Sequence, residues 1–274
     1  MRYAALVAAS ADVAATRSRT AKVQRLADLL RASDPQEVGV VVAHLSGVVP
    51  QRRLGVGYRS LSSLPTPADS PSLTVAEVDE AFTALASAGG EGSTGERRSL
   101  LEHLMSRATA DEQAFLRALI TGNLRQGALD GVMLPAIAAA YEVPDVSVRR
   151  AAMLAGFAGP VAQAAATGGV EAVDAIGLVV GRPVRPMLAS SEKTVAEAVA
   201  RVGGAEVVID GKLDGIRIQG HRRAGEVRIF TRSLDEITAR VPEVVAAIAG
   251  LPGGDRVVDG EAILMRADGR PAPF

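Results

Sequence analysis

Apolar side chains recur every three to four residues along roughly the first 180 positions, and this spacing predicts one amphipathic helix after another. On a segment that starts near Thr20, for example, Val23, Leu26 and Leu30 fall on one face. The same periodicity predicts later helices over residues 132–141, 146–156 and 161–167, the last ended by Gly168-Gly169. The first part of the chain is therefore expected to be all-helical.

Polar residues mark where several of these helices begin. A Thr or Asp followed three positions later by Glu is the sequence signature of a capping box, in which each side chain accepts a hydrogen bond from the other residue's backbone N–H. These capping signals are found at Asp34-Pro35-x-Glu37, Thr74-x-x-Glu77, Thr109-x-x-Glu112 and Thr194-x-x-Glu197. Between the helices, proline-rich and glycine-rich stretches predict loops over residues 62–72 and 89–95.

The pattern changes near Gly181, where Gly181-Arg182-Pro183-Val184-Arg185-Pro186 cannot continue a helix. Beyond it, alternating apolar and polar positions predict a hairpin that turns at Arg223-Ala224-Gly225, and a further strand over residues 256–264. Helices are expected over residues 194–202, with an apolar face, and from Pro242 to Ala249. We therefore predict two domains, residues 1–180 and 181–274, the first α and the second α+β.

Composition excludes several classes of protein. The chain has no cysteine, so it holds neither a disulfide nor a thiolate metal site. No apolar run approaches the ~20 residues that span a bilayer, and residues 2–11 merge into helical patterning instead of forming a secretory leader. The formal net charge is −1, so a nucleic-acid-binding face would have to be a local patch. We expect a cytoplasmic protein without a membrane segment.

One lysine stands out in the second domain. The β-branched run at residues 207–209 predicts a strand that leads to Lys212, and Ile216 resumes a strand-like alternation. Among 30 lysine and arginine residues only three are lysines, at positions 22, 193 and 212. Arginine cannot give up its proton, whereas a lysine amine is nucleophilic once neutral, a state that burial or a nearby cation favours. Lys212 is therefore a candidate nucleophile.

Three short motifs follow one another in this domain. The first is K-x-D-G-x-R, formed by Lys212, Asp214, Gly215 and Arg217. The second is Phe230-Thr231-Arg232, about 20 residues further on, and the third is Asp259-Gly260-Glu261, about 30 residues after that. Each motif alone is compatible with a strand-end turn, and only their order and spacing make them specific.

These motifs resemble the signatures of the covalent nucleotidyltransferases, which include ATP-dependent DNA ligases and mRNA-capping enzymes. Pro186-Met187-Leu188-Ala189 is similar to the segment that opens the ligase adenylation domain. Residues 122–127, G-N-L-R-Q-G, resemble the G-E-L-R-x-G segment of the helical DNA-binding domain in archaeal-type and actinobacterial ligases, with Asn123 in place of the usual acid. The resemblance thus covers both halves of the chain.

The resemblance implies a helical DNA-binding domain over residues 1–180 and, over residues 181–274, the first part of a mixed α/β nucleotidyltransferase (ATP-grasp-like) adenylation domain. It implies that Lys212 becomes bonded to AMP and that Arg217 and Arg232 contact the nucleotide. Glu261 would hold the ribose or take part in metal binding, and Asp210 would lie beside the adenine. By the same resemblance, Asp214, Gly215 and Asp259 support these motifs, and Arg125 contacts DNA.

The implied substrates are ATP, with Mg²⁺, and nicked double-stranded DNA, sealed by a monomer in DNA replication, repair and recombination. In that family the adenylation domain continues well past D-G-E and is followed by an OB-fold domain. Only 13 residues follow Glu261. We therefore expect a C-terminally truncated ligase that does not seal nicks in isolation.

Two alternatives remain open. A capping-type guanylyltransferase shares K-x-D-G-x-R but has no need of a helical leader of ~180 residues, and it would be labelled by GTP instead of ATP. A non-catalytic DNA-binding module predicts salt-sensitive binding to duplex without labelling of Lys212. An NAD-dependent ligase also carries K-x-D-G, but its cysteine zinc site is impossible here.

Overall fold

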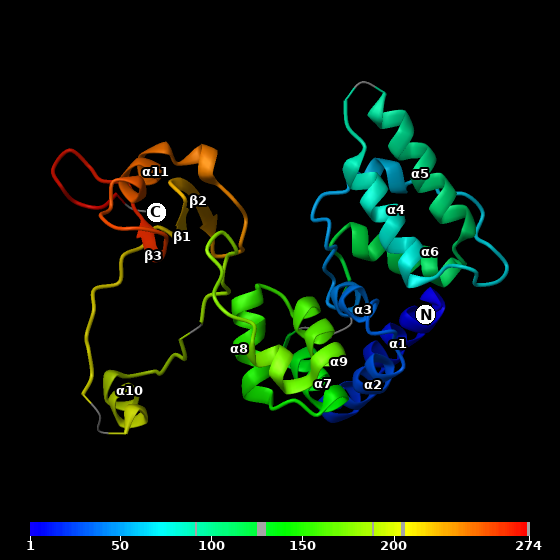
Figure 1. Ribbon diagram of the computed structural model, residues 1–274, viewed down its shortest axis with the longest axis horizontal. Coiled ribbons are helices and arrows are strands. Elements are labelled where there is room, and N and C mark those ends of the chain that lie inside the picture. The colour runs from blue at the N-terminus through cyan, green and yellow to red at the C-terminus, as the bar shows by residue number, and fades with distance from the viewer. Residues whose placement is uncertain (91, 125–129, 188, 204–205, 273–274) are drawn as a thin grey trace. The chain divides into compact units, whose positions relative to one another are not determined.

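The computed structural model describes residues 1–90, 92–124, 130–187, 189–203 and 206–272. The chain forms two compact units (Figure 1). The helical unit comprises Met1–Ala152 and Phe157–Gly177, and the sheet unit comprises Met153–Gly156 and Leu178–Phe274. The described part of the chain is rich in helix, with eleven α-helices and one three-stranded sheet.

The helical unit is built from pairs of packed helices. Helix α2 packs against α7, α3 against α9, α4 against α5, and α1 against α2 and α6. A 3₁₀ turn, η1, covers Tyr58–Leu61. The helices are α1 (Tyr3–Ala15), α2 (Arg19–Arg31), α3 (Val38–Leu45), α4 (Val75–Ser87), α5 (Ser93–Arg107), α6 (Ala110–Ile120), α7 (Asp130–Tyr141), α8 (Asp145–Ala155) and α9 (Ala158–Asp174).

Most of the predicted helix starts are confirmed. Complete capping boxes begin α4 at Thr74 and α6 at Thr109. The predicted start at Asp34 is wrong, because α3 begins only at Val38. The Glu37 carboxylate pairs with the terminal ammonium of Met1 instead of capping the helix. A capping signal thus fails when a stronger charge competes for the glutamate.

Two glycine-based boundaries need adjustment. Helix α9 runs to Asp174, but Gly169, with φ 61° and ψ −144°, interrupts its helical geometry at the predicted stop. The predicted loop over residues 89–95 is shorter, since α5 begins at Ser93. That helix carries charged residues on much of its surface, which hides its periodicity in the sequence.

The interior of the helical unit contains a small polar cluster. Tyr3, His44 and Glu112 are each fully buried, and the Tyr3 hydroxyl lies 3.2 Å from His44 Nδ1. Burial lowers the pKa of His44 from 6.5 to about 4, and burial together with the charge of Glu112 raises the pKa of Tyr3. His44 is therefore neutral in the folded chain at neutral pH.

We expect the helical unit to lose stability in mild acid because of His44. A histidine whose folded-state pKa is depressed contributes full stability above pH 6.5, and this contribution is lost as the pH falls from 6.5 toward 4. At about 1.4 kcal/mol per pKa unit, the loss is about 3 kcal/mol. Urea unfolding followed by far-UV circular dichroism at several pH values measures it.

His44→Gln is expected to flatten this pH dependence, whereas His103→Gln, which alters an exposed histidine, leaves it unchanged. The pKa of Glu77 is lowered to about 2 by its bonds to Arg107 and Thr74, so its effect on stability appears only below its ordinary value of 4.5. An equally steep loss in wild type and His44→Gln between pH 6.5 and 4 would exclude His44 as the cause.

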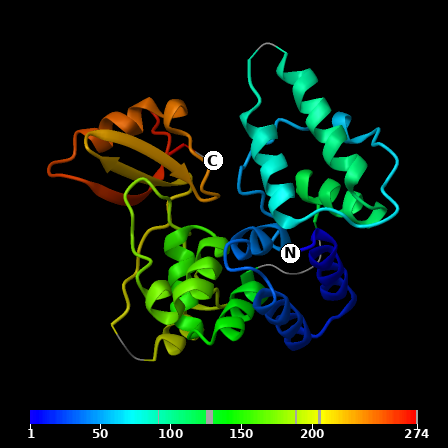
Figure 2. The ribbon, with the colours of Figure 1, turned by 45° about the vertical axis from the view of Figure 1, so that its right-hand side comes forward.

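The sheet unit is organised around the antiparallel sheet β2-β1-β3 (Figure 2). The strands β1 and β2 form the predicted hairpin, and β3 pairs with the other edge of β1 so that Arg217 lies opposite Glu261. The elements are α10 (Val195–Val202), β1 (Ile216–Arg223), β2 (Glu226–Thr231), η2 (Thr238–Arg240), α11 (Pro242–Ala249) and β3 (Arg256–Ala262).

The two faces of this sheet pack against different parts of the chain. Ile218, Val227 and Ile229 on one face pack against Ile248 of α11 and form the core of the unit. On strand β1, Arg217, Gln219 and His221 alternate with these residues and so point to the other face. This other face, which carries Arg217, Gln219 and His221, is the polar face of the sheet.

The chain leading into the sheet unit covers part of that polar face. Gln219 and Val184 exchange two hydrogen bonds, one of them from Val184 N to Gln219 Oε1 at 2.9 Å. Gly181 N donates to His221 Nδ1 at 2.9 Å, and both side chains on β1 are buried. Residues 181–184 thus cover Gln219 and His221 in the middle of the polar face, whereas its Arg217 end is open.

Arg222 fixes the connection between α11 and β3. Arg222 is 8% exposed, and its guanidinium donates to the carbonyl oxygens of Ala249 at 2.9 Å and Leu251 at 2.6 Å. It also donates to the carbonyl oxygens of Gly253 and Gly254. A cation at the C-terminal end of a helix satisfies carbonyl groups that have no partner within the helix.

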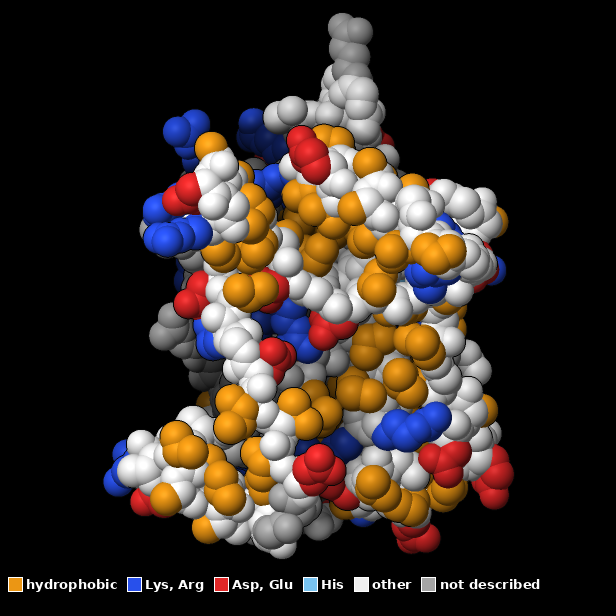
Figure 3. Space-filling view, turned by 90° about the vertical axis from the view of Figure 1, so that its left-hand side faces the viewer, with side chains coloured by type: hydrophobic (Ala, Val, Ile, Leu, Met, Phe, Trp, Pro, Cys, Tyr) orange, Lys and Arg blue, Asp and Glu red, His pale blue; other side chains and the backbone are white. Residues whose placement is uncertain are grey.

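Of the two elements predicted at the start of the sheet unit, the strand is wrong and the helix is confirmed. Residues 207–209 form no strand, and Val208 and Ile209 are 88% and 90% exposed. Helix α10 forms with its complete capping box, as predicted, and none of its residues is buried. Exposed hydrophobic side chains are visible among charged ones in the view of Figure 3. The local conformation of α10 is thus confirmed, whereas the burial of an apolar face depends on a packing partner as well.

Candidate active site

The turn between Lys212 and strand β1 depends on a glycine. A Cβ atom at Gly215 would lie 2.4 Å from the carbonyl oxygen of Ala262, closer than side chains approach. The absence of a side chain therefore lets the turn pass directly over the end of β3. Gly215 N donates to Glu261 Oε1 at 3.0 Å, which ties the turn to the D-G-E motif.

Arg217 and Asp259 form a forked ion pair across the same two strands. Arg217 Nε donates to Asp259 Oδ1 at 3.2 Å, and Nη2 donates to Oδ2 at 2.8 Å. The hydrogen bonds to Asp259 raise the pKa of Arg217. Asp259 thus holds the guanidinium in one orientation at the open end of the polar face.

Arg232 follows the last residue of β2 and is presented by a network of hydroxyl groups. Thr231 Oγ1 lies 2.9 Å from Ser233 Oγ, which donates to Asp235 Oδ2 at 2.6 Å. Asp235 N closes the turn by donating to Thr231 Oγ1 at 3.3 Å. Within the described residues, Arg232 has no ion pair of its own, so its guanidinium is available to a ligand.

These motifs line one cavity of about 780 Å³. Three cations contribute to its wall, Lys212, Arg217 and Arg232, together with the carboxylates of Asp214 and Glu261. The sequence-predicted residues from all three motifs thus come together in one place. The remaining lining residues are Leu213, Gly215, Ile216, Thr231 and Ser233.

Lys212 is not buried, although apolar segments flank it in the sequence. Its side chain is 81% exposed and pairs with the carboxylate of Asp214. The reason lies in residues 206–214, which have no regular structure and therefore provide no strand on the near side of the lysine. Asp210 belongs to the same segment and does not line the cavity.

The chemistry of this cavity suits a phosphorylated nucleotide. Two guanidinium groups and an ammonium group favour an anionic ligand, and Arg217 is already oriented. Glu261 uses Oε1 for the Gly215 backbone, so Oε2 remains for a ribose hydroxyl or for a metal that also binds phosphate oxygens. The described residues contain no cluster of three or more His, Asp or Glu side chains that could hold a metal by itself.

The segment expected to bind DNA lies in the helical unit and is only partly described. Asn123, which replaces the usual acid in G-N-L-R-Q-G, donates from Nδ2 to the hydroxyl of Tyr58 at 2.6 Å. Arg125, and Leu188 of the P-M-L-A segment, lie outside the described residues. The structure therefore links the beginning of this segment to η1.

Several residues that line or support these sites are not part of any motif recognised in the sequence. Gln219 and His221 occupy ordinary alternating strand positions, and only long-range contacts show that they anchor residues 181–184. Ser233 directly follows the second motif, and that proximity was the one available signal. Tyr58 lies 65 positions before Asn123, so no local pattern connects them.

In the part of the chain that the structure describes, no helix is long and apolar enough to cross a membrane.

Comparison with protein families identifies both units. Residues 55–138 match the family described as DNA ligase N terminus, and residues 186–274 match the ATP dependent DNA ligase domain. The first match lies within the helical unit and includes Tyr58 and Asn123. The second contains all three motifs that line the cavity.

Curated relatives of this chain are named as probable DNA ligases. The chain is 53% identical to a probable DNA ligase of Beutenbergia cavernae, with 100% of this chain and 55% of the relative aligned. It is 53% identical to one from a Nocardioides species and 51% identical to one from Rhodococcus jostii, aligned over 98% and 100% of this chain. The chain spans about half the length of these relatives. With both family matches and these identities, the chain belongs to the ATP-dependent DNA ligase family.

Proposed function

We propose that this chain provides the DNA-binding and lysine-adenylating parts of an ATP-dependent DNA ligase. Residues 1–180 would be a helical domain that binds nicked double-stranded DNA, and residues 181–274 the first portion of a mixed α/β nucleotidyltransferase (ATP-grasp-like) adenylation domain. The observation that carries the proposal is the cavity shared by Lys212, Arg217, Arg232 and Glu261.

In the proposed reaction, the neutral Nζ of Lys212 attacks the α-phosphorus of ATP. A nitrogen–phosphorus bond forms, the bond from that phosphorus to the bridging oxygen breaks, and pyrophosphate leaves. The ammonium group loses one proton to solvent before the attack and another after it, which leaves a phosphoramidate. AMP then passes to the 5′-phosphate of a nick, and the 3′-hydroxyl displaces it.

Negative charge develops on phosphate oxygens in each of these steps, and the cationic residues of the cavity would stabilise it. Arg217, held by Asp259, and Arg232, which has no ion pair in the described structure, are the proposed nucleotide contacts. Glu261 would bind the ribose or a Mg²⁺ ion, which neutralises phosphate charge when bound. We propose Asp210 for the adenine, with Asp214 and Gly215 shaping the lysine turn.

We further propose a cytoplasmic monomer that acts in DNA replication, repair and recombination, with Arg125 as one of its DNA contacts. The family match to an ATP dependent domain supports ATP over GTP as substrate. A capping-type guanylyltransferase would instead accept GTP, so parallel reactions with the two labelled nucleotides separate these functions.

The direct test is incubation of the chain with α-³²P-labelled ATP and Mg²⁺. We expect an acid-labile, alkali-stable adduct on the polypeptide that maps by mass spectrometry to Lys212. The scarcity of lysine makes the mapping unambiguous, since only positions 22 and 193 compete. An adduct on either of those residues, or no adduct, would contradict the proposed chemistry.

A further inference from the structure

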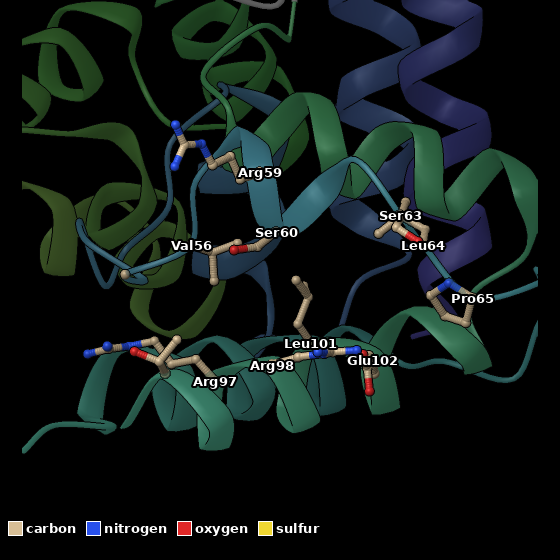
Figure 4. A pocket seen from close by; sticks show the side chains of 12 residues that line it. Val56, Arg59, Ser60, Ser63, Leu64, Pro65, Arg97, Arg98, Leu101 and Glu102 are labelled. Carbon is tan, nitrogen blue, oxygen red and sulfur yellow. The ribbon is translucent and has the colours of Figure 1, made fainter. Parts of the chain in front are cut away.

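A second cavity, of about 450 Å³, lies in the helical unit between residues 55–65 and helix α5 (Figure 4). Leu101 and Val56 provide apolar side chains, and Figure 4 shows Leu101 extending from α5 toward residues 55–65 and Val56 extending from that segment toward α5. Polar groups surround them. The lining residues are Gly55, Val56, Arg59, Ser60, Ser63, Leu64, Pro65, Thr94, Arg97, Arg98, Leu101 and Glu102.

The polar lining has the composition of a phosphate site. Arg59, Arg97 and Arg98 contribute three guanidinium groups against one carboxylate, that of Glu102. Three hydroxyl groups, from Ser60, Ser63 and Thr94, add further donors. Guanidinium and hydroxyl groups are the side chains that most often contact nucleic-acid phosphates. In a chain of net charge −1, this cavity is a local concentration of positive charge.

The three arginines are not equally available. Arg97 donates to Leu85 O at 3.4 Å and to Ala88 O, and so closes the C-terminal end of α4. Arg98 bonds to Glu102 through Nε at 2.8 Å, which leaves its two terminal nitrogens for another acceptor. The Arg59 guanidinium has no hydrogen bond or ion pair to any described residue, and only the backbone carbonyl of Arg59 is bonded, to Ser62. A ligand would therefore be held by Arg59 and Arg98.

The position of Arg59 favours an extended ligand over an enclosed one. Figure 4 shows its side chain projecting from η1 away from α5, so it lies at the rim of the cavity. The neighbouring Tyr58 is 68% exposed and accepts the hydrogen bond from Asn123 of the G-N-L-R-Q-G segment. The rim of the cavity and the segment proposed to bind DNA are thus joined by a direct contact.

We infer that this cavity and its rim bind two phosphates of the DNA sugar–phosphate backbone, one contacted by Arg98 on α5 and the other by Arg59 at the rim. The inference rests on the proposed DNA binding and adds a second contact site to that of the G-N-L-R-Q-G segment. A free nucleotide offers the same phosphate chemistry, so the experiment includes it as a separate ligand.

The test compares binding of a fluorescein-labelled nicked duplex to the wild-type chain and to Arg59→Gln/Arg98→Gln, by fluorescence anisotropy at several NaCl concentrations. We expect the variant to raise Kd about tenfold and to reduce the slope of log Kd against log[salt] by about 1.8, since each lost phosphate contact contributes about 0.9. Arg59→Lys/Arg98→Lys keeps the charges and should retain most of the slope.

Arg25→Gln/Arg149→Gln is the matched control. It replaces two exposed arginines of the same unit that already form ion pairs, Arg25 with Asp12 and Arg149 with Asp145. We expect its Kd to stay within about twofold of wild type, because these residues line no part of the cavity. Thermal unfolding of each variant verifies that the helical unit is intact.

Several results would overturn the inference: equal losses in the control, an unchanged slope in the cavity variant, or no duplex binding by the wild-type chain. Loss of binding to a fluorescent ATP analogue, with duplex binding kept, would assign the cavity to a nucleotide instead and also overturn it. Labelling of Lys212 by ATP does not involve this unit. Failure of the proposed adenylation is therefore distinguishable from failure at this cavity.

Discussion

Lys212→Arg is expected to abolish labelling of the chain by α-³²P-ATP, by more than about 10³-fold, while duplex binding stays within about twofold of wild type. Arginine keeps the positive charge but cannot supply a neutral nitrogen to attack phosphorus. Removal of a covalent nucleophile eliminates the step itself and not merely one stabilising contact. Quantitative autoradiography of the denatured protein measures the first effect and fluorescence anisotropy the second.

Lys193→Arg is the control for this prediction. It makes the same substitution in the same unit at a residue that does not line the cavity, so its labelling should equal that of wild type. Retained labelling in Lys212→Arg would show that Lys212 is not the nucleophile. Loss of duplex binding in the same variant would show that the lysine contacts DNA directly.

Gly215→Ala is expected to slow labelling by about 100-fold, although it changes no group that takes part in the chemistry. The added Cβ would lie 2.4 Å from the carbonyl oxygen of Ala262 and 2.8 Å from Ile263 Cγ2. The turn must therefore move away from β3, which breaks the bond from Gly215 N to Glu261 and displaces Lys212. Misplacement of a reacting group by about 1 Å can cost 10²-fold in rate. Single-turnover labelling with rapid quenching gives the rate.

Gly260→Ala is the matched control, because a Cβ there meets nothing within 4 Å, although it lies on the neighbouring strand. Its labelling rate should remain within about threefold of wild type. Equal rates for Gly215→Ala and wild type would mean that the contact with β3 does not position the lysine.

Local signals in the sequence were reliable where the structure they specify is also local. The capping boxes at Thr74, Thr109 and Thr194 all formed, and helix α11 has the predicted bounds. The capping interaction needs only residues three positions apart, so it forms whether or not the helix is later buried. Helix α10 shows this separation, since it is capped and yet wholly exposed.

Predictions that depended on distant partners were less successful. Residues 207–209 have the β-branched composition of a strand, but a strand also needs a neighbour to receive its backbone hydrogen bonds. The three motifs identified most of the cavity residues because each motif is a fixed group of residues that are close together in the sequence. Their mutual contacts, such as Arg217 with Asp259, could not be derived from spacing alone, because they follow from the register of β1 against β3.

The ion pair between Arg217 and Asp259 has a thermodynamic consequence for the proposed nucleotide binding. Immobilising a long side chain on binding costs about 0.5–1.5 kcal/mol of rotamer entropy. For Arg217 that cost is met when the sheet folds, since Asp259 already selects its rotamer. For Arg232 the same entropy is lost only when the ligand binds. The two arginines can thus make similar contacts and still contribute unequally to affinity, with the preorganised one giving the larger net gain.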